Sequence, residues 1–329
     1  MRRAATPLFL LGAVLLSIFL SLRLGHVPLE TREVFRGLLG AGDDLHRQIL
    51  MEIRLPRALL GVLVGGGLAL AGSVFQALLR NPLAEPYILG ISGGSAAGAV
   101  LVLSLGLTAT SSAALPVAAF AGALLAVLLV FRVAASADRR LDVRVLLLAG
   151  VVVGSFFTAV IALILSLSEA QAVRSAVLWM MGSLAGATWR NVAVVAAYTL
   201  PSTLALMALS RALNLMSIGE ETASYLGTDV ERVKRVAYGV ASLITAAGVA
   251  VAGIIGFVGL IVPHALRLVV GSDQRVLLPL SFLAGAAFLT MADLGARLFL
   301  DPTEIPIGVV TAFLGVPLFL VLLRRSLSG

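Results

Sequence analysis

Long apolar runs recur along this chain, and they restrict its fold more than any other feature. A run of about 20 apolar residues crosses a bilayer as an α-helix, because each residue advances the helix by about 1.5 Å. A shorter run at 257–271 contains Pro263 and is either a short span or a re-entrant segment; we count it as a span. Nine longer runs lie at 7–25, 56–79, 88–106, 113–134, 145–167, 192–209, 236–256, 276–299 and 305–323. The pattern predicts an all-α polytopic membrane protein with about ten transmembrane helices.

The composition agrees with this class and excludes a soluble domain. Of the 329 residues, 60% are hydrophobic and only 12% are charged, and the charged share is about half that of an ordinary soluble protein. No small-residue cleavage site follows the first apolar run, so we interpret it as a span rather than a signal peptide. We therefore expect residues 1–329 to form a single transmembrane domain. Cysteine is absent, which excludes disulfides, thiolate metal sites and cysteine nucleophiles.

The basic residues predict the orientation of the chain. Ten spans place both ends on one side of the membrane. Most of the 24 basic residues then fall on that side, in the chain ends and in the loops around Arg80, Arg211 and Lys234. Because Lys and Arg gather on the cytoplasmic side, both termini are expected to be cytoplasmic. The pI near 10.9 needs no nucleic-acid partner, since the excess charge faces anionic membrane lipid.

One charged segment on this basic side stands apart from the apolar runs. Ser217 and Glu220 have the spacing of a capping box, so we expect Ser217 to begin a short helix. Gly227 stands where such a helix would end, and Thr228 or Asp229 is expected to cap the next one. A short, well-capped polar helix at the surface of a membrane protein suggests contact with a soluble partner.

The usual signatures of catalysis are missing. The three histidines, His26, His46 and His264, have no metal-ligand spacing, so no metal site is expected. Lys234, the only lysine, lies in no Gly-rich phosphate-binding loop, so the chain is not expected to hydrolyse nucleotide. No nucleophile has an evident base. A membrane-embedded enzyme is thus the weakest of the functions considered.

Asp293 is the one carboxylate inside a predicted span. Such a residue is costly in the membrane and usually faces a partner or water. Arg297 follows one helical turn later, and this spacing favours an ion pair between the two side chains over a proton relay. An ion-coupled secondary transporter with Asp293 as its ion site remains the main alternative function.

Several motifs occur together in the second to tenth spans. They are Arg54-Leu-Pro-Arg57, Gly72 with Gln76-Ala-Leu-Leu-Arg-Asn-Pro-Leu-Ala-Glu-Pro86, Leu89-Gly-Ile-Ser-Gly-Gly-Ser-Ala-Ala-Gly98, Gly219-Glu-Glu-x-Ala-x-x-Leu-Gly227, Gly256-Phe-Val-Gly-Leu-Ile-Val-Pro-His-x-x-Arg267, Ala292-Asp-x-x-Ala-Arg297 and Glu304-Ile-Pro-Ile-Gly-Val-Val-Thr-Ala-x-x-Gly-x-Pro317. In this order they resemble the FecCD-type permeases, the membrane subunits of type II ABC importers for iron siderophores, haem and cobalamin. The likeness begins near residue 50, and the first span resembles the family only in being an apolar run.

The resemblance implies a fold, partners and a substrate class. It implies ten helices per subunit, a homodimer with the translocation path at the subunit interface, two cytoplasmic ABC ATPase subunits and a periplasmic or lipoprotein substrate-binding protein. ATP and Mg would bind to the ATPase subunits, and no cofactor is expected on this chain. The substrate would be a bulky metal chelate, an iron siderophore or haem, with cobalamin close behind. The location would be the cytoplasmic (inner) membrane of a bacterium or archaeon.

The resemblance also assigns roles to residues at the two ends of the bundle. Residues of the segment at about 215–230 match the coupling helices that dock on the ATPase, although the acidic pair can also be read as solvated surface. Arg54, Arg57 and Arg297 match arginines that grip carboxylates of the binding protein, with anchoring at lipid headgroups as the alternative. The coupling residues are Ser217, Gly219, Glu220, Glu221, Ala223, Leu226 and Gly227.

The likeness points to the fifth span, 145–167, and to a short helix at about 172–182 as the wall and gate of the translocation path. Ser155, Thr158 and Ser166 are therefore the predicted path residues.

Overall fold

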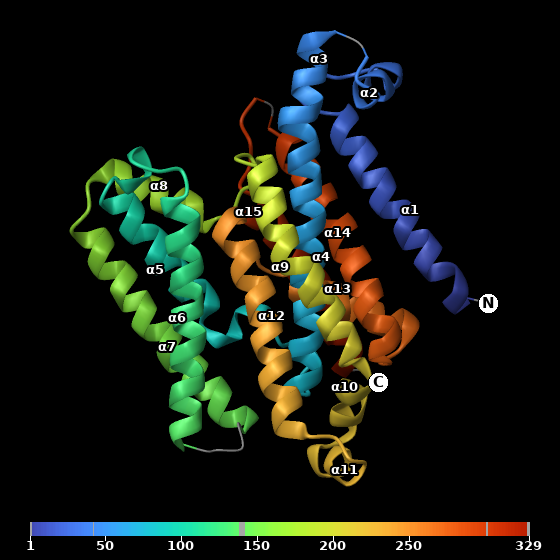
Figure 1. Ribbon diagram of the computed structural model, residues 1–329, viewed down its shortest axis with the longest axis vertical. Coiled ribbons are helices and arrows are strands. Elements are labelled where there is room, and N and C mark those ends of the chain that lie inside the picture. Colours follow the sequence, from blue (N-terminus) through green and yellow to red (C-terminus); the bar gives the residue numbers. More distant parts are fainter. Residues whose placement is uncertain (1, 42, 138–141, 301, 328–329) are drawn as a thin grey trace.

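The computed structural model describes residues 2–41, 43–137, 142–300 and 302–327, and in these ranges it is helical with no β-strand (Figure 1). Seven helices are long and apolar enough to cross a membrane, and three shorter apolar helices lie at Ile91–Ser104, Val258–Val270 and Ile307–Leu320. Together they confirm the ten predicted spans. The run at 257–271, for which two interpretations were open, is a helix of 13 residues.

The helices follow one another with short connections. In chain order they are α1 (Arg2–Arg23), α2 (Thr31–Leu38), α3 (Asp44–Gln48), a π-helical turn (Ile49–Arg54), α4 (Leu55–Leu78), a 3-10 turn (Pro86–Leu89), α5 (Ile91–Ser104), a 3-10 turn (Leu107–Ala109), α6 (Ala114–Ala137), α7 (Val143–Ser166), α8 (Ala170–Met180), α9 (Trp189–Ala208), α10 (Ser210–Ile218), α11 (Glu220–Tyr225), α12 (Val230–Ala252), α13 (Val258–Val270), α14 (Gln274–Leu298) and α15 (Ile307–Leu327).

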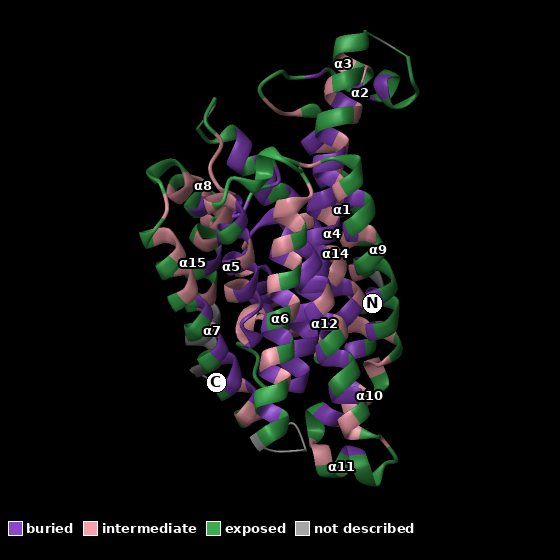
Figure 2. Cartoon of the chain, turned by 60° about the vertical axis from the view of Figure 1, so that its left-hand side comes forward, coloured by how far each residue is buried: buried purple, intermediate pink, exposed green. Residues whose placement is uncertain are grey.

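The helix α4 forms the centre of the molecule and is buried along nearly its whole length (Figure 2). It packs against α9, α12, α13 and α14. Glycine permits these contacts: a Cβ atom on Gly72 would overlap the backbone of Gly259 in α13, and one on Gly65 would overlap the backbone of Gly285 in α14. In lipid, where hydrophobic burial does not drive helix association, such close backbone packing holds a bundle together.

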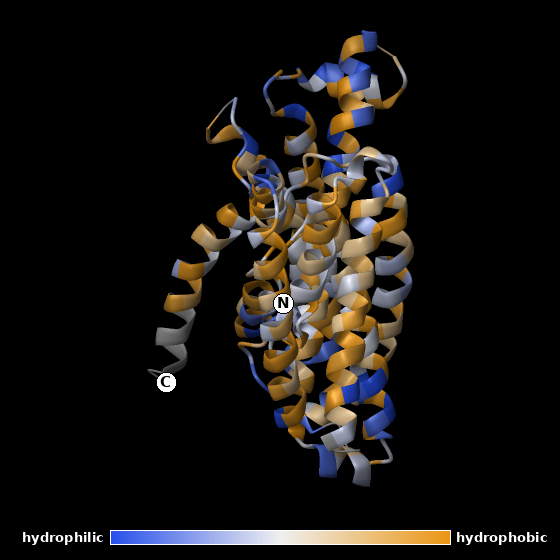
Figure 3. Cartoon of the chain, turned by 90° about the vertical axis from the view of Figure 1, so that its left-hand side faces the viewer, coloured by the Kyte–Doolittle hydropathy of each residue, from blue (hydrophilic) through white to orange (hydrophobic). Residues whose placement is uncertain are grey.

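A second group of helices, α5 to α8, lies to one side of α4 (Figure 1). Helices α5 and α6 pack closely through Gly94 and Gly122. At the edge, α7 contacts α5 and α6 on one face and leaves the other exposed. Hydrophobic residues predominate along the bodies of the long helices, and hydrophilic residues gather at the two ends of the bundle (Figure 3). This distribution is that of a membrane-spanning bundle.

The segment between the first and second spans is largely helical. It contains α2 and α3, and the π-helical turn continues directly into α4. Val34 is buried with Leu22, Leu29 and Leu50 in a small apolar cluster. Helical structure is favoured here because this cluster supplies an apolar surface on which α2 can bury one face.

Irregular backbone interrupts the bundle between α12 and α13. Phe257 has a left-handed backbone (φ 69°), and its N–H donates to the Glu85 carboxylate at 2.9 Å. The Tyr87 hydroxyl lies 3.0 Å from the Ile255 carbonyl oxygen and accepts from the Ile255 N–H at 3.2 Å. Non-helical backbone is tolerated in a membrane protein only where its polar groups find such partners.

Candidate functional site

The short helix α11 lies at one end of the bundle, beyond α10 and α12 (Figure 1). It is separated from α10 by Gly219 and ends at Gly227, which has a left-handed backbone (φ 81°). The Asp229 carboxylate then accepts from the Arg232 N–H at 3.0 Å and caps α12. The predicted end at Gly227 and the predicted cap at Asp229 are confirmed.

The predicted start of this helix is wrong. Ser217 lies in the last turn of α10, and its hydroxyl donates to the Asn214 carbonyl at 2.7 Å. The reason is Gly219, whose extended backbone (φ 164°) divides the segment into two helices after Ser217. Glu220 therefore has no capping-box role, and its carboxylate accepts from the Lys234 ammonium at 2.6 Å.

The two sides of α11 differ sharply. Ala223 is buried against the bundle, whereas Glu221 is exposed. Tyr225 is 90% exposed and Leu226 62% exposed, and Ile218 beside them is also exposed. Large apolar side chains in such numbers at a polar end of a molecule indicate a contact surface. We call Ile218, Tyr225 and Leu226 the α11 surface.

A polar hollow of about 660 Å³ lies beside α11, between the end of α4 and the start of α7. Basic and acidic side chains share its wall. Its lining residues are Leu79, Arg80, Asp142, Val143, Arg144, Gly219, Glu220, Glu221, Thr222 and Lys234. In the described part of the chain, no three His, Asp or Glu side chains gather as a metal site would require.

At the opposite end of the bundle, Arg57 holds two carboxylates. Its Nη2 lies 2.9 Å from Asp293 Oδ1 and its Nε 3.0 Å from Asp293 Oδ2. Its Nη1 and Nη2 also donate to the two oxygens of Glu304, at 2.8 and 2.9 Å. Arg297 Nε lies 3.4 Å from Asp293 Oδ2 and its Nη2 donates to the Ser21 hydroxyl at 2.7 Å. We call Arg57, Asp293, Arg297 and Glu304 the arginine cluster.

Arg54 lies beside this cluster but binds only backbone. Its guanidinium donates to the carbonyls of Leu22 at 2.7 Å and Arg23 at 3.1 Å, and to that of Val27. It thereby joins the start of α4 to the end of α1. Helices α1 and α4 are thus fixed to each other at this end.

The predicted Asp293–Arg297 pair is confirmed, and sequence reasoning missed Arg57 as its third member. No local signal could have found it, because Arg57 and Asp293 are 236 residues apart. Both oxygens of Asp293 already face guanidinium groups, which fits a structural ion pair rather than a cation site. The structure thus gives no support to the ion-coupled alternative.

We expected the three arginines to lie at the surface, but they are buried: Arg54 is 4%, Arg57 6% and Arg297 5% exposed. A carboxylate of another protein could reach them only after these internal contacts opened, so their role in docking stays a prediction. Glu304 is the outermost member of the cluster, in the loop before α15. Burial raises the pKa of its carboxyl, but hydrogen bonds from Arg57 and the positive charge of Arg57 outweigh burial and hold that pKa below its usual range.

Ser155, Thr158 and Ser166 all lie on exposed parts of α7. The hydroxyls of Thr158 and Ser166 donate to carbonyls of their own helix, at 2.9 and 2.8 Å. With their hydroxyl protons used inside the helix, Thr158 and Ser166 offer few polar groups to a neighbouring molecule. Their exposed neighbours on this helix are Leu148, Val151, Val152, Phe156 and Leu163. The short helix that we expected to follow this span is present as α8.

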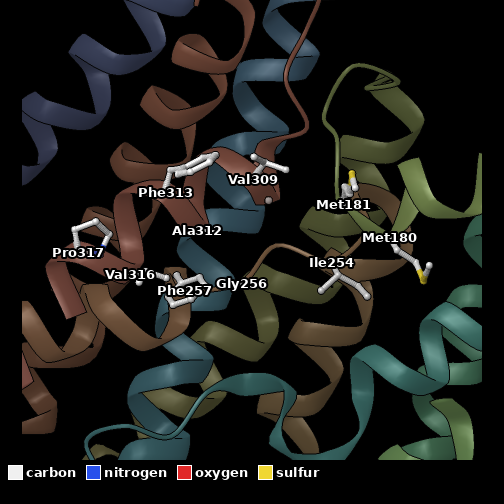
Figure 4. A pocket seen from close by; sticks show the side chains of 11 residues that line it. Met180, Met181, Ile254, Gly256, Phe257, Val309, Ala312, Phe313, Val316 and Pro317 are labelled. Carbon is white, nitrogen blue, oxygen red and sulfur yellow. The ribbon is translucent and has the colours of Figure 1, made fainter. Parts of the chain in front are cut away.

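A groove of about 630 Å³ that the sequence did not predict opens between α8, the break after α12 and α15. Figure 4 shows Met180, Met181 and Ile254 on one side and Phe257, Phe313 and Pro317 on the other. The wall is almost entirely apolar. The groove and the exposed face of α7 are two large apolar surfaces that no described segment covers.

Comparison with known proteins places these features in a family. The chain is 45% identical over 276 residues to the cobalamin import system permease BtuC of Halobacterium salinarum, covering 84% of this chain and 73% of that protein. It is 36% identical over 327 residues to the hemin transport system permease HmuU of Yersinia pestis, covering 97% of this chain and 96% of that protein.

A solved structure shares the fold. It is an inward-facing conformation of a transporter assigned to the metal-chelate type of ABC transporter, with a TM-score of 0.87, 32% identity, and coverage of 97% of this chain and 99% of that one. The model of the FecCD transport family matches residues 13–325. With ten apolar helices in its described residues and a match over nearly its whole length, the chain belongs to the FecCD transport family and is an ABC transporter permease subunit.

Proposed function

We propose that this permease moves a bulky metal chelate across the cytoplasmic membrane into the cell, driven by ATP hydrolysis on a separate subunit. Relatives named for cobalamin and for hemin support a chelate built on a large ring system. An iron siderophore is a further candidate from the sequence motifs. ATP and Mg would bind to the ATPase subunits, and a periplasmic or lipoprotein binding protein would deliver the chelate.

The observation that carries this proposal is the α11 surface. It presents Tyr225 and Leu226 outward at the end of the bundle where Arg80, Arg144 and Arg232 also lie. Basic residues mark the cytoplasmic side, where the ATPase subunits of an ABC transporter work. An apolar helix face at that position fits a groove on a soluble protein.

Two copies of the chain would enclose the path. The exposed face of α7 and the groove beside α15 are apolar surfaces large enough to receive another helix. In one copy, α4 and its neighbours pack too closely for a chelate of about a nanometre to pass, because interiors of this kind hold few voids larger than water. A twofold assembly can open a path by moving two rigid bundles apart.

The docking role can be tested with Tyr225→Glu and Leu226→Glu in one variant. Charges on both side chains would have to be desolvated in the interface, so we expect the partner ABC ATPase subunit to be lost on purification, with binding at least about tenfold weaker. The measurement is co-purification from membranes followed by titration with the ATPase subunit. Leu39→Glu, at an 85% exposed position, is the matched control and should leave binding unchanged. Unaltered binding of the double variant would refute docking at α11.

The shared path can be tested by single cysteines in this cysteine-free chain. Ser155→Cys, Thr158→Cys and Ser166→Cys are expected to crosslink between two permease copies, with yields that change between the nucleotide-free and ATP-bound states of the assembly. Gly12→Cys in α1, at the opposite edge of the bundle (Figure 1), should not crosslink. The readout is the dimer band on a non-reducing gel. If none of the three α7 positions yields a dimer in any state, the path does not lie between two copies at this helix.

A further inference from the structure

Lys234, the only lysine of the chain, is 1% exposed at the start of α12. Its ammonium lies 2.6 Å from Glu220 Oε2 and 3.6 Å from Glu231 Oε1. Burying an ammonium is unfavourable unless carboxylates surround it. The Glu220 side chain, for which the sequence suggested docking on the ATPase, therefore points inward and bonds α11 to α12.

Glu220 also faces the central helix. Arg80, directly after α4, places Nη2 4.0 Å from Glu220 Oε1. Arg80 has a left-handed backbone (φ 48°), which is uncommon outside glycine. One carboxylate of α11 thus lies between a cation on α12 and a cation at the end of α4.

The other attachments of α11 are slight. Gly219 precedes it in an extended conformation, and Gly227 follows it in a left-handed one. At both positions the backbone is unrestricted by a side chain, because glycine lacks the Cβ that limits φ. Ala223 supplies a single small side chain to the contact with the bundle. Glu220 is thus the α11 side chain whose ion pairs join this helix to α12 and to the end of α4.

We propose that the Glu220–Lys234 pair is a positioning pair that transmits displacement of α11 to α12. This inference rests on the proposed function, in which α11 docks on the ATPase subunit. A helix that pivots freely on two glycines would absorb such a displacement, whereas a helix bonded to Lys234 carries it into α12. The pair acts on coupling and not on docking, because the α11 surface points the other way.

The displacement has a route to the membrane-embedded part of the protein. Helix α12 runs from Val230 to Ala252 and is followed by the irregular segment that holds Phe257. That segment lines the apolar groove beside α15 (Figure 4). A shift of α12 along its axis would therefore move one wall of the groove, since a helix behaves as a rigid rod over this length.

The test compares Glu220→Gln, Lys234→Met, the double variant Glu220→Gln/Lys234→Met, and Lys234→Arg, which keeps the positive charge, each in the full assembly in lipid vesicles. ATP hydrolysis and uptake are measured on the same sample, with radiolabelled cobalamin, haemin or a ferric siderophore, whichever the unmodified assembly accumulates. We expect each neutralised variant to retain the ATPase subunit and its activity, while uptake per ATP falls about tenfold, within the usual range of coupling between sites. Lys234→Arg should retain most of the uptake, because it keeps the ion pair with Glu220, and Glu52→Gln, an exposed carboxylate at the opposite end of the bundle, should change nothing.

The double variant separates positioning from simple stability. Replacing both members of a buried pair by neutral side chains is often tolerated, and the charges that lose a partner here, Arg80 and Glu231, are partly exposed to solvent. A purely structural role therefore predicts normal uptake per ATP for the double variant. A second readout needs no substrate: spin labels at Ser224→Cys and Arg235→Cys should give one narrow distance distribution in the otherwise unmodified assembly and a broad one in the double variant.

Normal uptake per ATP or a narrow distribution in the double variant would overturn the proposal. Loss of the ATPase subunit from the variants of the pair would also overturn it, because the pair would then serve docking itself. Failure of the Tyr225 and Leu226 test, by contrast, would remove the proposed docking role and leave the bond between α11 and α12 as a structural feature only.

Discussion

Replacing Arg57 by methionine is expected to destabilise the folded permease by about 3–5 kcal/mol, the usual cost of removing one partner of a buried ion pair. In this variant Asp293 would keep its ion pair with Arg297 but lose the one with Arg57. Glu304 would lose the two guanidinium hydrogen bonds that hold the loop before α15. Methionine fills a similar volume, so the loss comes from charge and hydrogen bonding rather than from a cavity. The measurement is thermal unfolding in detergent, followed by size-exclusion chromatography of the remaining folded protein.

Arg36→Met is the matched control, because Arg36 lies at the same end of the molecule with an exposed side chain. It should unfold at the temperature of the unmodified protein. Arg57→Lys should fall between the two, since an ammonium cannot bind two carboxylates with paired hydrogen bonds as a guanidinium does. If Arg57→Met unfolds normally but no longer binds the substrate-binding protein, the arginine cluster is a docking site and the interpretation as a structural cluster is wrong.

Gly72→Val is expected to prevent folding of the bundle almost completely. A Cβ atom at this position would overlap the carbonyl group of Gly259, and neither group is a flexible side chain that could rotate away. Overpacking of a core costs about 1–3 kcal/mol where side chains can adjust, and here α4 and α13 would have to separate. We expect the variant to be absent from the monodisperse fraction after extraction from the membrane.

Gly239→Val provides the control for helix propensity, because Gly239 also lies within a helix and a Cβ atom there would meet nothing within 4 Å. Both changes place the same β-branched residue in a transmembrane helix. Folding of Gly239→Val together with failure of Gly72→Val would assign the effect to the contact with Gly259. Equal folding of the two variants would show that α4 and α13 can pack at a greater distance than the structure has.

The sequence determined the class of fold and much of its helical order. Runs of about 20 apolar residues leave the backbone no alternative to helices in lipid, because every N–H and C=O must be satisfied within the segment. For the same reason the ends of α11 and α12 were partly predictable: Gly227 and Asp229 act through their own backbone and nearest neighbours.

The sequence did not determine which charges meet. Ser217 was a wrong helix start because Gly219, two residues later, interrupts the helix, and Glu220 turned inward because Lys234 on another helix is buried beneath it. Arg57 and Asp293 are adjacent only because α4 and α14 pack side by side. Local patterns fix hydrogen bonds that close within a few residues, whereas the partner of a buried charge depends on which helices pack together, and only the tertiary structure decides that.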